Sequence, residues 1–126
     1  MGADTEALEG LHVMVVEDEP NAREILGDLF TYFGANVTLA INATQGLATL
    51  RQIEPDVVVA DMRLGDHTAS WLLREARKMS CKSAFVAVTA YDFEERTIRA
   101  QGFSALLKKP LRRERLLEAV TNAARK

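Results

Sequence analysis

A chain of 126 residues has room for one domain of ordinary size and little left for a second. Its composition, 48% hydrophobic and 27% charged with a formal net charge of −2, is that of a globular protein and provides no general attraction to nucleic acid or anionic lipid. The single cysteine excludes an internal disulfide, and no apolar run approaches the roughly 18 residues of a membrane span. We therefore expect a cytoplasmic protein with no direct nucleic-acid partner and no membrane partner.

Short apolar segments alternate with longer amphipathic ones along the chain. Strands are predicted at residues 11–16, 37–41, 57–60, 84–88 and 103–107. Helices are predicted between and after them, where apolar residues recur at helical spacing. These residues are Ile25, Leu26, Leu29, Phe30 and Phe33, then Ala43, Leu47, Leu50 and Ile53, then Leu72, Leu73 and Ala76, and finally Leu116, Leu117, Val120 and Ala124. The segment 92–101 has few apolar residues and is the weakest predicted helix.

Local signals mark several helix ends. Pro20 suits the first turn of a helix, where its missing N–H is not needed. Asp92 with Glu95 three residues later has the pattern of a capping box, so a helix is predicted to start there. Gly34 and Gly102 stand where helices are expected to end in a left-handed residue.

Five strand–helix repeats predict an α/β fold. The strand segments are apolar without regular alternation, which indicates burial on both faces and hence a parallel sheet with helices on each side. Right-handed crossovers then produce a doubly wound open sheet. We assign residues 1–10 to an N-terminal tail and residues 11–126 to this single domain. In such sheets the functional crevice lies beyond the carboxyl ends of the strands.

Candidate site residues follow four of the five predicted strands. Glu17 and Asp18 come after the first strand, Asp61 after the third, Thr89 after the fourth and Lys109 after the fifth. Each alone has an ordinary structural explanation, such as a helix cap or a solvated strand end, but their shared location favours one site. Clustered carboxylates repel unless a cation lies among them, and hard oxygen ligands suit Mg²⁺. Such a set can position a phosphoryl group while Asp61 attacks phosphorus as a nucleophile.

These residues stand in motifs that resemble the receiver domain of bacterial two-component response regulators. The motifs are Val-Val-Glu-Asp-Glu-Pro at 15–20, Val-Val-Val-Ala-Asp at 57–61, Val-Thr-Ala at 88–90 and Lys-Lys-Pro at 108–110. In this order and spacing they are highly specific, and the resemblance extends from Leu11 to Arg125. It implies a five-stranded parallel sheet in the order 2-1-3-4-5. It also implies a phosphoryl donor, either a histidine kinase or a histidine phosphotransfer protein, and a downstream protein target or output domain.

The resemblance further implies a role for each site residue. Asp61 corresponds to the phosphoacceptor. Asp18 and Asp61 correspond to ligands of Mg²⁺, with Glu17 completing the acidic pocket and the backbone carbonyl of Arg63 as a further ligand. Lys109 corresponds to the lysine that contacts the phosphoryl group.

Further positions concern signalling rather than phosphorylation itself. The resemblance implies that Thr89 turns toward the phosphoryl oxygen and that the bond before Pro110 is cis. Four residues, Met62, Arg63, Ala90 and Tyr91, occupy positions beside the site that modulate the reaction, chiefly the lifetime of the phosphoryl group. The usual aromatic residue of the fifth strand is replaced by Leu106, and Leu64-Gly65-Asp66-His67-Thr68 replaces the common Pro-Gly after the acceptor.

Two other functions compete with phosphoryl acceptance. A flavodoxin-like cofactor-binding protein would need N–H donors after the first strand, whereas Glu17-Asp18-Glu19-Pro20 offers acidic side chains and one donor fewer. A receiver-like interaction module without phosphorylation would lack some site residues, and none of the five is missing. The basic stretch containing Lys108, Arg112, Arg113 and Arg115 is interpreted as a solvated face, and His67 as a solvated loop residue.

Overall fold

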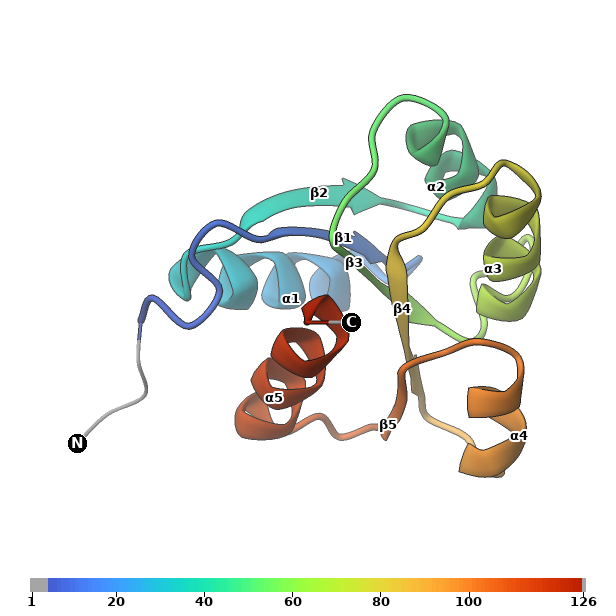
Figure 1. The fold of residues 1–126 in the computed structure, drawn as a ribbon. Coiled ribbons are helices and arrows are strands. Elements are labelled where there is room, and N and C mark those ends of the chain that lie inside the picture. Colours follow the sequence, from blue (N-terminus) through green and yellow to red (C-terminus); the bar gives the residue numbers. More distant parts are fainter. Residues whose placement is uncertain (1–4, 126) are drawn as a thin grey trace.

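The fold is a five-stranded parallel sheet between two layers of helices (Figure 1). The computed structural model describes residues 5–125. The strands are β1 His12–Val16, β2 Asn36–Ala40, β3 Val57–Asp61, β4 Ala84–Thr89 and β5 Ala105–Lys108, arranged in the order β2-β1-β3-β4-β5. The helices are α1 Pro20–Tyr32, α2 Ala43–Leu50, α3 Ala69–Lys78, α4 Glu95–Ala100 and α5 Arg113–Ala124. The predicted α/β class, element order and strand order are confirmed.

Both faces of the sheet are buried, as the lack of alternation in the strand segments predicts. On β1, Met14 and Val16 face a core shared with α2, α3 and α4, while Val13 and Val15 face a core shared with α1 and α5. The two layers are visible on opposite sides of the sheet in Figure 1. All parallel strands therefore end at the same edge, where their following residues meet.

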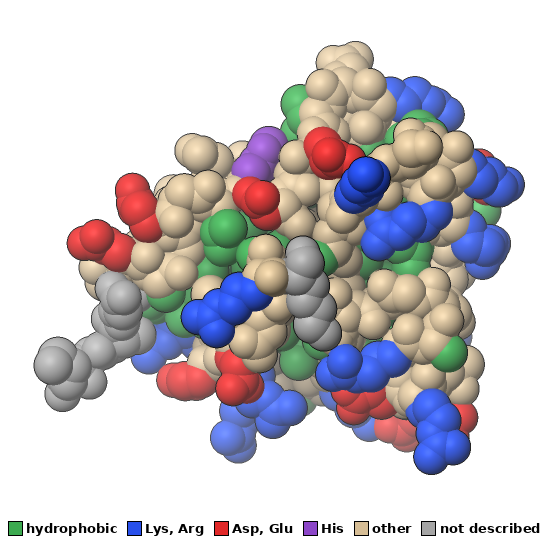
Figure 2. Space-filling model, viewed as in Figure 1, with side chains coloured by type: hydrophobic (Ala, Val, Ile, Leu, Met, Phe, Trp, Pro, Cys, Tyr) green, Lys and Arg blue, Asp and Glu red, His purple; other side chains and the backbone are tan. Residues whose placement is uncertain are grey.

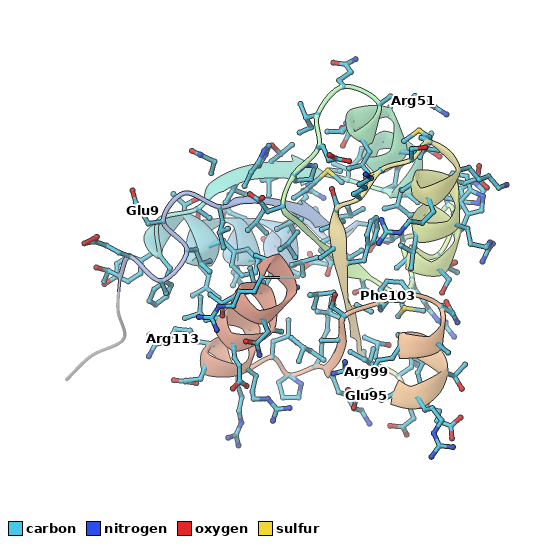
Figure 3. The ribbon with its side chains drawn as sticks, in the orientation of Figure 1. Glu9, Arg51, Glu95, Arg99, Phe103 and Arg113 are labelled. Atoms are coloured by element: carbon cyan, nitrogen blue, oxygen red, sulfur yellow. The ribbon has the colours of Figure 1, made fainter. Side chains whose placement is uncertain are left out.

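The predicted helix boundaries are confirmed at three places. Pro20 is the first residue of α1, and Gly34 and Gly102 follow α1 and α4 with φ of +100° and +117°. Gly34 also leaves room for the backbone of Glu9, which lies beside the end of α1 (Figure 3). Residues 5–10, assigned to the tail, form turns here, and Leu8 is fully buried while its N–H donates to the carbonyl of Phe33 over 2.8 Å.

The predicted capping box at Asp92 is wrong. Helix α4 begins only at Glu95, and its N-cap residue Glu94 makes no side-chain capping bond. The carboxylate of Asp92 instead pairs with Lys108 at the end of β5, and Glu95 pairs with Arg99 at 2.8 Å. Each acidic side chain has a cationic partner, so neither turns to the helix N–H groups. Helix α4 is consequently a short element without a side-chain cap, held to the core through the buried Ile98.

Each strand differs from its predicted bounds by one or two residues, and helix α2 is shorter than predicted. The fifth strand starts at Ala105 rather than 103, and Phe103 lies in the preceding loop, where its ring packs edge-on against Phe85 with centroids 6.2 Å apart. Helix α2 ends at Leu50, so Ile53 lies beyond it. Within residues 5–125, every helix falls short of the length and apolar character that crossing a bilayer requires.

Candidate phosphoryl-acceptor site

The carboxyl edge of the sheet brings the predicted residues together. The ammonium Nζ of Lys109 lies 2.6 Å from Oδ2 of Asp61 and 3.1 Å from Oε1 of Glu17, although these residues are far apart in sequence. The parallel pairing of β3 with β1 and β4, and of β4 with β5, sets this arrangement. The Lys109–Pro110 peptide bond is cis, in agreement with the implication of the resemblance. Sequence reasoning alone therefore found three side chains that are in contact.

Charge and burial act against each other in this cluster. The Glu17 side chain is only 2% exposed, and burial raises its pKa although the Glu19 N–H and the Lys109 ammonium oppose that rise. Burial would lower the pKa of Lys109, but hydrogen bonds to Asp61 and Glu17 outweigh it and raise the pKa instead. The ammonium group therefore remains charged and neutralises part of the acidic pocket.

Asp18 lies on the open side of the same edge. Glu19, not Asp18, caps α1, accepting hydrogen bonds from the N–H groups of Asn21 and Ala22 at 3.1 and 2.7 Å. Asp18 is exposed, and its Oδ2 lies 3.3 Å from the point where a side chain on Gly65 would begin. Because Glu19 caps the helix, the Asp18 carboxylate is not used for capping and can take part in the site.

The chemistry of these donors fits Mg²⁺. Among residues 5–125, no group of three or more Asp, Glu, His or Cys side chains is close enough to form a complete metal site. Magnesium, however, is typically held by one or two carboxylates together with water and phosphate oxygens. Asp18, Asp61 and Glu17 supply hard oxygen ligands of this kind at a partly open edge, with the Arg63 carbonyl in the adjoining loop.

Two loops meet above Asp61. The N–H of Arg63 donates to Oδ1 of Asp61 over 3.0 Å, and the Arg63 guanidinium lies 4.0 Å from the ring centroid of Tyr91. This cation–π contact joins the β3–α3 loop to the β4–α4 loop. The N–H of Tyr91 also donates to the hydroxyl of Thr89 over 3.0 Å. The resemblance implies that Arg63 and Tyr91 modulate the reaction, but the sequence provided no signal that they touch.

The remaining predicted positions surround these loops. Met62 is buried, Ala90 is exposed, and Leu106 is half-buried against the core that includes α4. His67 is exposed as expected, but its ring also stacks on Trp71, with centroids 3.8 Å apart and planes 8° apart. Only the spacing of four residues between these two rings hints at this contact.

An apolar cleft opens next to the acidic pocket. It lies between α1 and the segment that leads from β5 into α5, and two site residues, Glu17 and Lys109, form part of its wall. The apolar part of the wall consists of Ala22, Ile25, Leu26, Leu29, Pro110, Leu111 and Leu116. Ile25 is 66% exposed, although helical spacing groups it with the buried residues Leu26 and Phe30.

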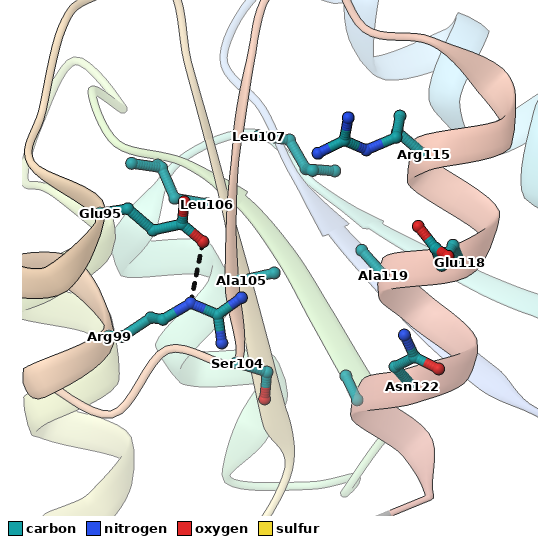
Figure 4. Close-up of a pocket in the computed structure, with 11 residues that line it drawn as sticks. Glu95, Arg99, Ser104, Ala105, Leu106, Leu107, Arg115, Glu118, Ala119 and Asn122 are labelled. Atoms are coloured by element: carbon teal, nitrogen blue, oxygen red, sulfur yellow. Dashed lines mark hydrogen bonds and ion pairs between the residues drawn. The ribbon is translucent and has the colours of Figure 1, made fainter.

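A second hollow lies at the β5 edge, between α4 and α5. Figure 4 shows Glu95 and Arg99 on its α4 side and Arg115, Glu118 and Asn122 on its α5 side, with Leu106 on the strand between them. None of the five strand-end site residues lines it. The basic residues at the start of α5 are exposed, and on the face seen in Figure 2 basic side chains are interspersed with acidic ones.

Comparison with known proteins identifies the family. The sequence model described as the response regulator receiver domain matches residues 13–121. The transcriptional regulatory protein GlrR of Escherichia coli is 27% identical over 114 residues, which cover 89% of this chain and 26% of GlrR. An uncharacterised 14.6 kDa protein of Leptolyngbya boryana is 30% identical over 110 residues, which cover 84% of each chain. The crystal structure of a response regulator receiver domain protein from Clostridium thermocellum has a TM-score of 0.85 at 24% identity, covering 91% of this chain and 94% of that one.

The chain belongs to the response regulator receiver domain family. Receiver domains are generally non-enzymatic signalling modules that interact with histidine kinases and output domains. They typically use Mg²⁺ at the phosphorylation site. The chain spans about a quarter of the length of GlrR, so the fold and the site correspond to one part of that longer protein.

Replacing Glu17 with Gln is expected to stabilise the metal-free protein at pH 7. Burial raises the Glu17 pKa above the ordinary value of 4.5, so the folded state favours the neutral form. The stability that this proton provides is fully present below pH 4.5 and is lost as the pH rises through the raised folded value. The free energy of unfolding of the variant should therefore rise relative to that of the wild type as the pH rises. The measurement is urea unfolding followed by circular dichroism, with EDTA present.

The matched control is Glu19→Gln, two residues away. Hydrogen bonds from the Ala22 and Asn21 N–H groups lower the Glu19 pKa, so the loss of this charge should destabilise the protein at pH 7, with the difference shrinking as the pH falls below 4.5. A Glu17→Gln variant that is less stable than wild type at pH 7 would show that the ion pair with Lys109 outweighs burial.

Proposed function

We propose that Asp61 accepts a phosphoryl group, in a Mg²⁺-dependent reaction, from a histidine kinase or a histidine phosphotransfer protein. The observation that carries the proposal is the contact of one ammonium group, that of Lys109, with both Asp61 and Glu17 at the carboxyl edge of the sheet. A nucleophilic carboxylate is thereby held beside a cation that can pair with a phosphoryl oxygen. We also propose a cytoplasmic location, which suits a chain whose one cysteine, Cys81, is unpaired.

In the proposed reaction a carboxylate oxygen of Asp61 attacks phosphorus. The new O–P bond forms as the N–P bond of phosphohistidine breaks, and the leaving imidazole nitrogen retains the electron pair and is later protonated. Lys109 pairs with a phosphoryl oxygen, and the Thr89 hydroxyl donates to another. Asp18, Asp61, Glu17 and the Arg63 carbonyl would hold the cation, which would neutralise charge on the phosphoryl oxygens. Positioning and charge neutralisation are the main requirements of such a transfer.

Replacing Asp61 with Asn should abolish phosphorylation by acetyl phosphate with Mg²⁺. An amide oxygen is a much weaker nucleophile, so the phosphorylated species should fall below detection in intact-mass spectra. The control is Asp28→Asn, because Asp28 is an exposed residue of α1 and should leave phosphorylation unchanged. Phosphorylation of the Asp61→Asn protein at the wild-type rate would show that another residue is the acceptor.

We further propose that the phosphoryl donor docks on the apolar cleft between α1 and the β5–α5 connection. A donor histidine must reach Asp61, and this cleft shares Glu17 and Lys109 with the acidic pocket. Its wall is otherwise mainly aliphatic, and the exposed Ile25 is part of it. An aliphatic surface next to the reacting group suits the apolar side of a donor helix, and Arg113, which lies 3.6 Å from the Glu114 carboxylate, adds a positive charge to the cleft wall.

Ile25→Ser should lower the rate of phosphotransfer from a histidine kinase by about tenfold or more, as for an anchor residue of an interface. The rate with acetyl phosphate should not change, because a small donor needs no docking surface. Tyr32→Ser is the matched control, since Tyr32 is 65% exposed on the same helix but lies outside the cleft. Equal kinase rates for wild type and Ile25→Ser would place the donor on another surface.

Phosphorylation is proposed to act on the β4–α4 loop. The Thr89 hydroxyl that would turn to the phosphoryl group now accepts a hydrogen bond from the Tyr91 N–H. Turning it away removes one of the contacts that hold the loop, and the helix that follows has only six residues and no side-chain cap. Leu106 packs against the core and has no ring to swing, so it is expected to stay in place.

Addition of beryllofluoride with Mg²⁺, which mimics the phosphoryl group, should shift the amide signals of residues 89–101 most strongly. The Leu106 methyl signals should move little, because leucine favours burial in both states. In Thr89→Ala the loop shifts should be much smaller, while the shifts at Asp61 persist. If the Leu106 methyl groups change from half-buried to fully buried instead, leucine acts as the switch and the loop is secondary.

A further inference from the structure

The segment that follows Asp61 forms a small closed hairpin. Arg63 and Thr68 pair as an antiparallel bridge, and the Leu64 N–H donates to the carbonyl of His67 over 3.1 Å. At the tip, Gly65 has φ of +81°, which residues with side chains rarely adopt. We refer to residues 63–68 as the acceptor hairpin. Its base lies at the acceptor, because the Arg63 N–H binds the Asp61 carboxylate.

The tip of the acceptor hairpin is fastened to α2 by one carboxylate. Oδ1 of Asp66 accepts hydrogen bonds from the N–H groups of Ala43 and His67 at 3.0 and 2.8 Å. Oδ2 of Asp66 accepts from the Thr44 N–H and the Thr44 hydroxyl at 2.9 and 2.6 Å. Ala43 and Thr44 begin α2, where N–H groups lack partners within the helix and a negative charge is favourable.

Asp66 is therefore held as an anion. Burial acts to raise its pKa, but the hydrogen bonds from Thr44, Ala43 and His67 outweigh that effect and hold the pKa well below its ordinary value. Helix α2 also has its own cap, since the side chain of Asn42 accepts from the Gln45 N–H over 2.8 Å. The first turn of α2 thus has a local cap and a second, distant one, and only the distant one reaches the acceptor hairpin.

The other side of the hairpin faces the proposed cation site. The missing side chain of Gly65 makes room for the Asp18 carboxylate, whose Oδ2 would lie 3.3 Å from a Cβ at that position. The hairpin thus lies between Asp18 on one side and the start of α2 on the other. Movement of its tip would change both the space around Asp18 and the position of the Arg63 carbonyl at its base.

We propose that Asp66 is a positioning residue for the cation site: by binding the first turn of α2 it fixes the acceptor hairpin, and so holds the Arg63 carbonyl and the backbone beside Asp18 in place. The inference rests on the proposed Mg²⁺ site but concerns a residue outside it. Groups that orient metal ligands in this way typically contribute about 10- to 100-fold to metal affinity. The coupling between hairpin attachment and cation binding is reciprocal, so cation binding should in turn strengthen the attachment of the hairpin to α2.

The test is a Mg²⁺ titration of the unphosphorylated protein, followed by amide chemical shifts and calorimetry. Asp66→Ala should weaken Mg²⁺ binding by about tenfold or more. The control is Asn42→Ala, which removes the other cap of α2 but leaves the hairpin attached. Both Asn42→Ala and Asp66→Ala should lower the midpoint of urea unfolding. The Mg²⁺ affinity of Asn42→Ala should nevertheless stay within about twofold of wild type, because this change leaves the hairpin contacts intact.

Equal Mg²⁺ affinity in Asp66→Ala and wild type, with lowered stability, would overturn the inference and leave Asp66 a structural cap only. If Asp66→Ala does not fold, Thr44→Val removes the hydroxyl bond alone, and a loss of about two- to fivefold in affinity is expected for one such bond. No loss in that variant would equally contradict the proposal. Failure of the wild-type protein itself to bind Mg²⁺ would instead overturn the cation site, and this inference with it.

Discussion

The contact of the Lys109 ammonium with two carboxylates is the interaction on which the site depends. Glu17 is almost fully buried and Asp61 nearly so, and two carboxylates so placed would repel each other and resist dehydration. A positive charge between them reduces both penalties. For this reason two acidic side chains can be buried at the edge of the sheet. Two carboxylates and one ammonium group still carry a net negative charge, which favours the approach of a further cation. The same charges that are unfavourable for folding are those that suit phosphoryl chemistry.

The sheet supplies the geometry that this interaction needs. Because β1 and β3 are neighbours, the residues that follow them lie side by side, and β4 and β5 bring Lys109 to the same edge. The backbone continues the pairing past the strand ends, since the N–H of Lys109 donates to the carbonyl of Thr89 over 2.7 Å and that of Met62 to the carbonyl of Val88 over 2.8 Å. The side chains are thus carried by paired backbone rather than by free loops. The hydrogen-bonded backbone therefore fixes the distances between the site side chains.

The element order and the site residues at the strand ends could be predicted from patterns local in sequence, whereas the strand order and the roles of single residues were implied by the family resemblance. Apolar runs and helical spacing predict the elements, and the shared direction of parallel strands predicts that their following residues meet. Other contacts between residues distant in sequence left no such pattern. Asp92 matched a capping box, yet its partner Lys108 comes from a strand 16 residues later. Asp66 binds Thr44, which precedes it by 22 residues. Helical spacing likewise does not show that Ile25 borders an open cleft.

The cation–π contact between Arg63 and Tyr91 has a consequence for sequence change in this family. Each side chain comes from a different loop, and the contact between them, 4.0 Å from guanidinium carbon to ring centroid, lies above the acceptor. A change at either residue alters a surface that the other also forms, so the effect of a substitution at one position should depend on the residue at the other. Related chains are then expected to change these two residues together. Moving only one of them into another receiver domain would not transfer the contact between the two loops.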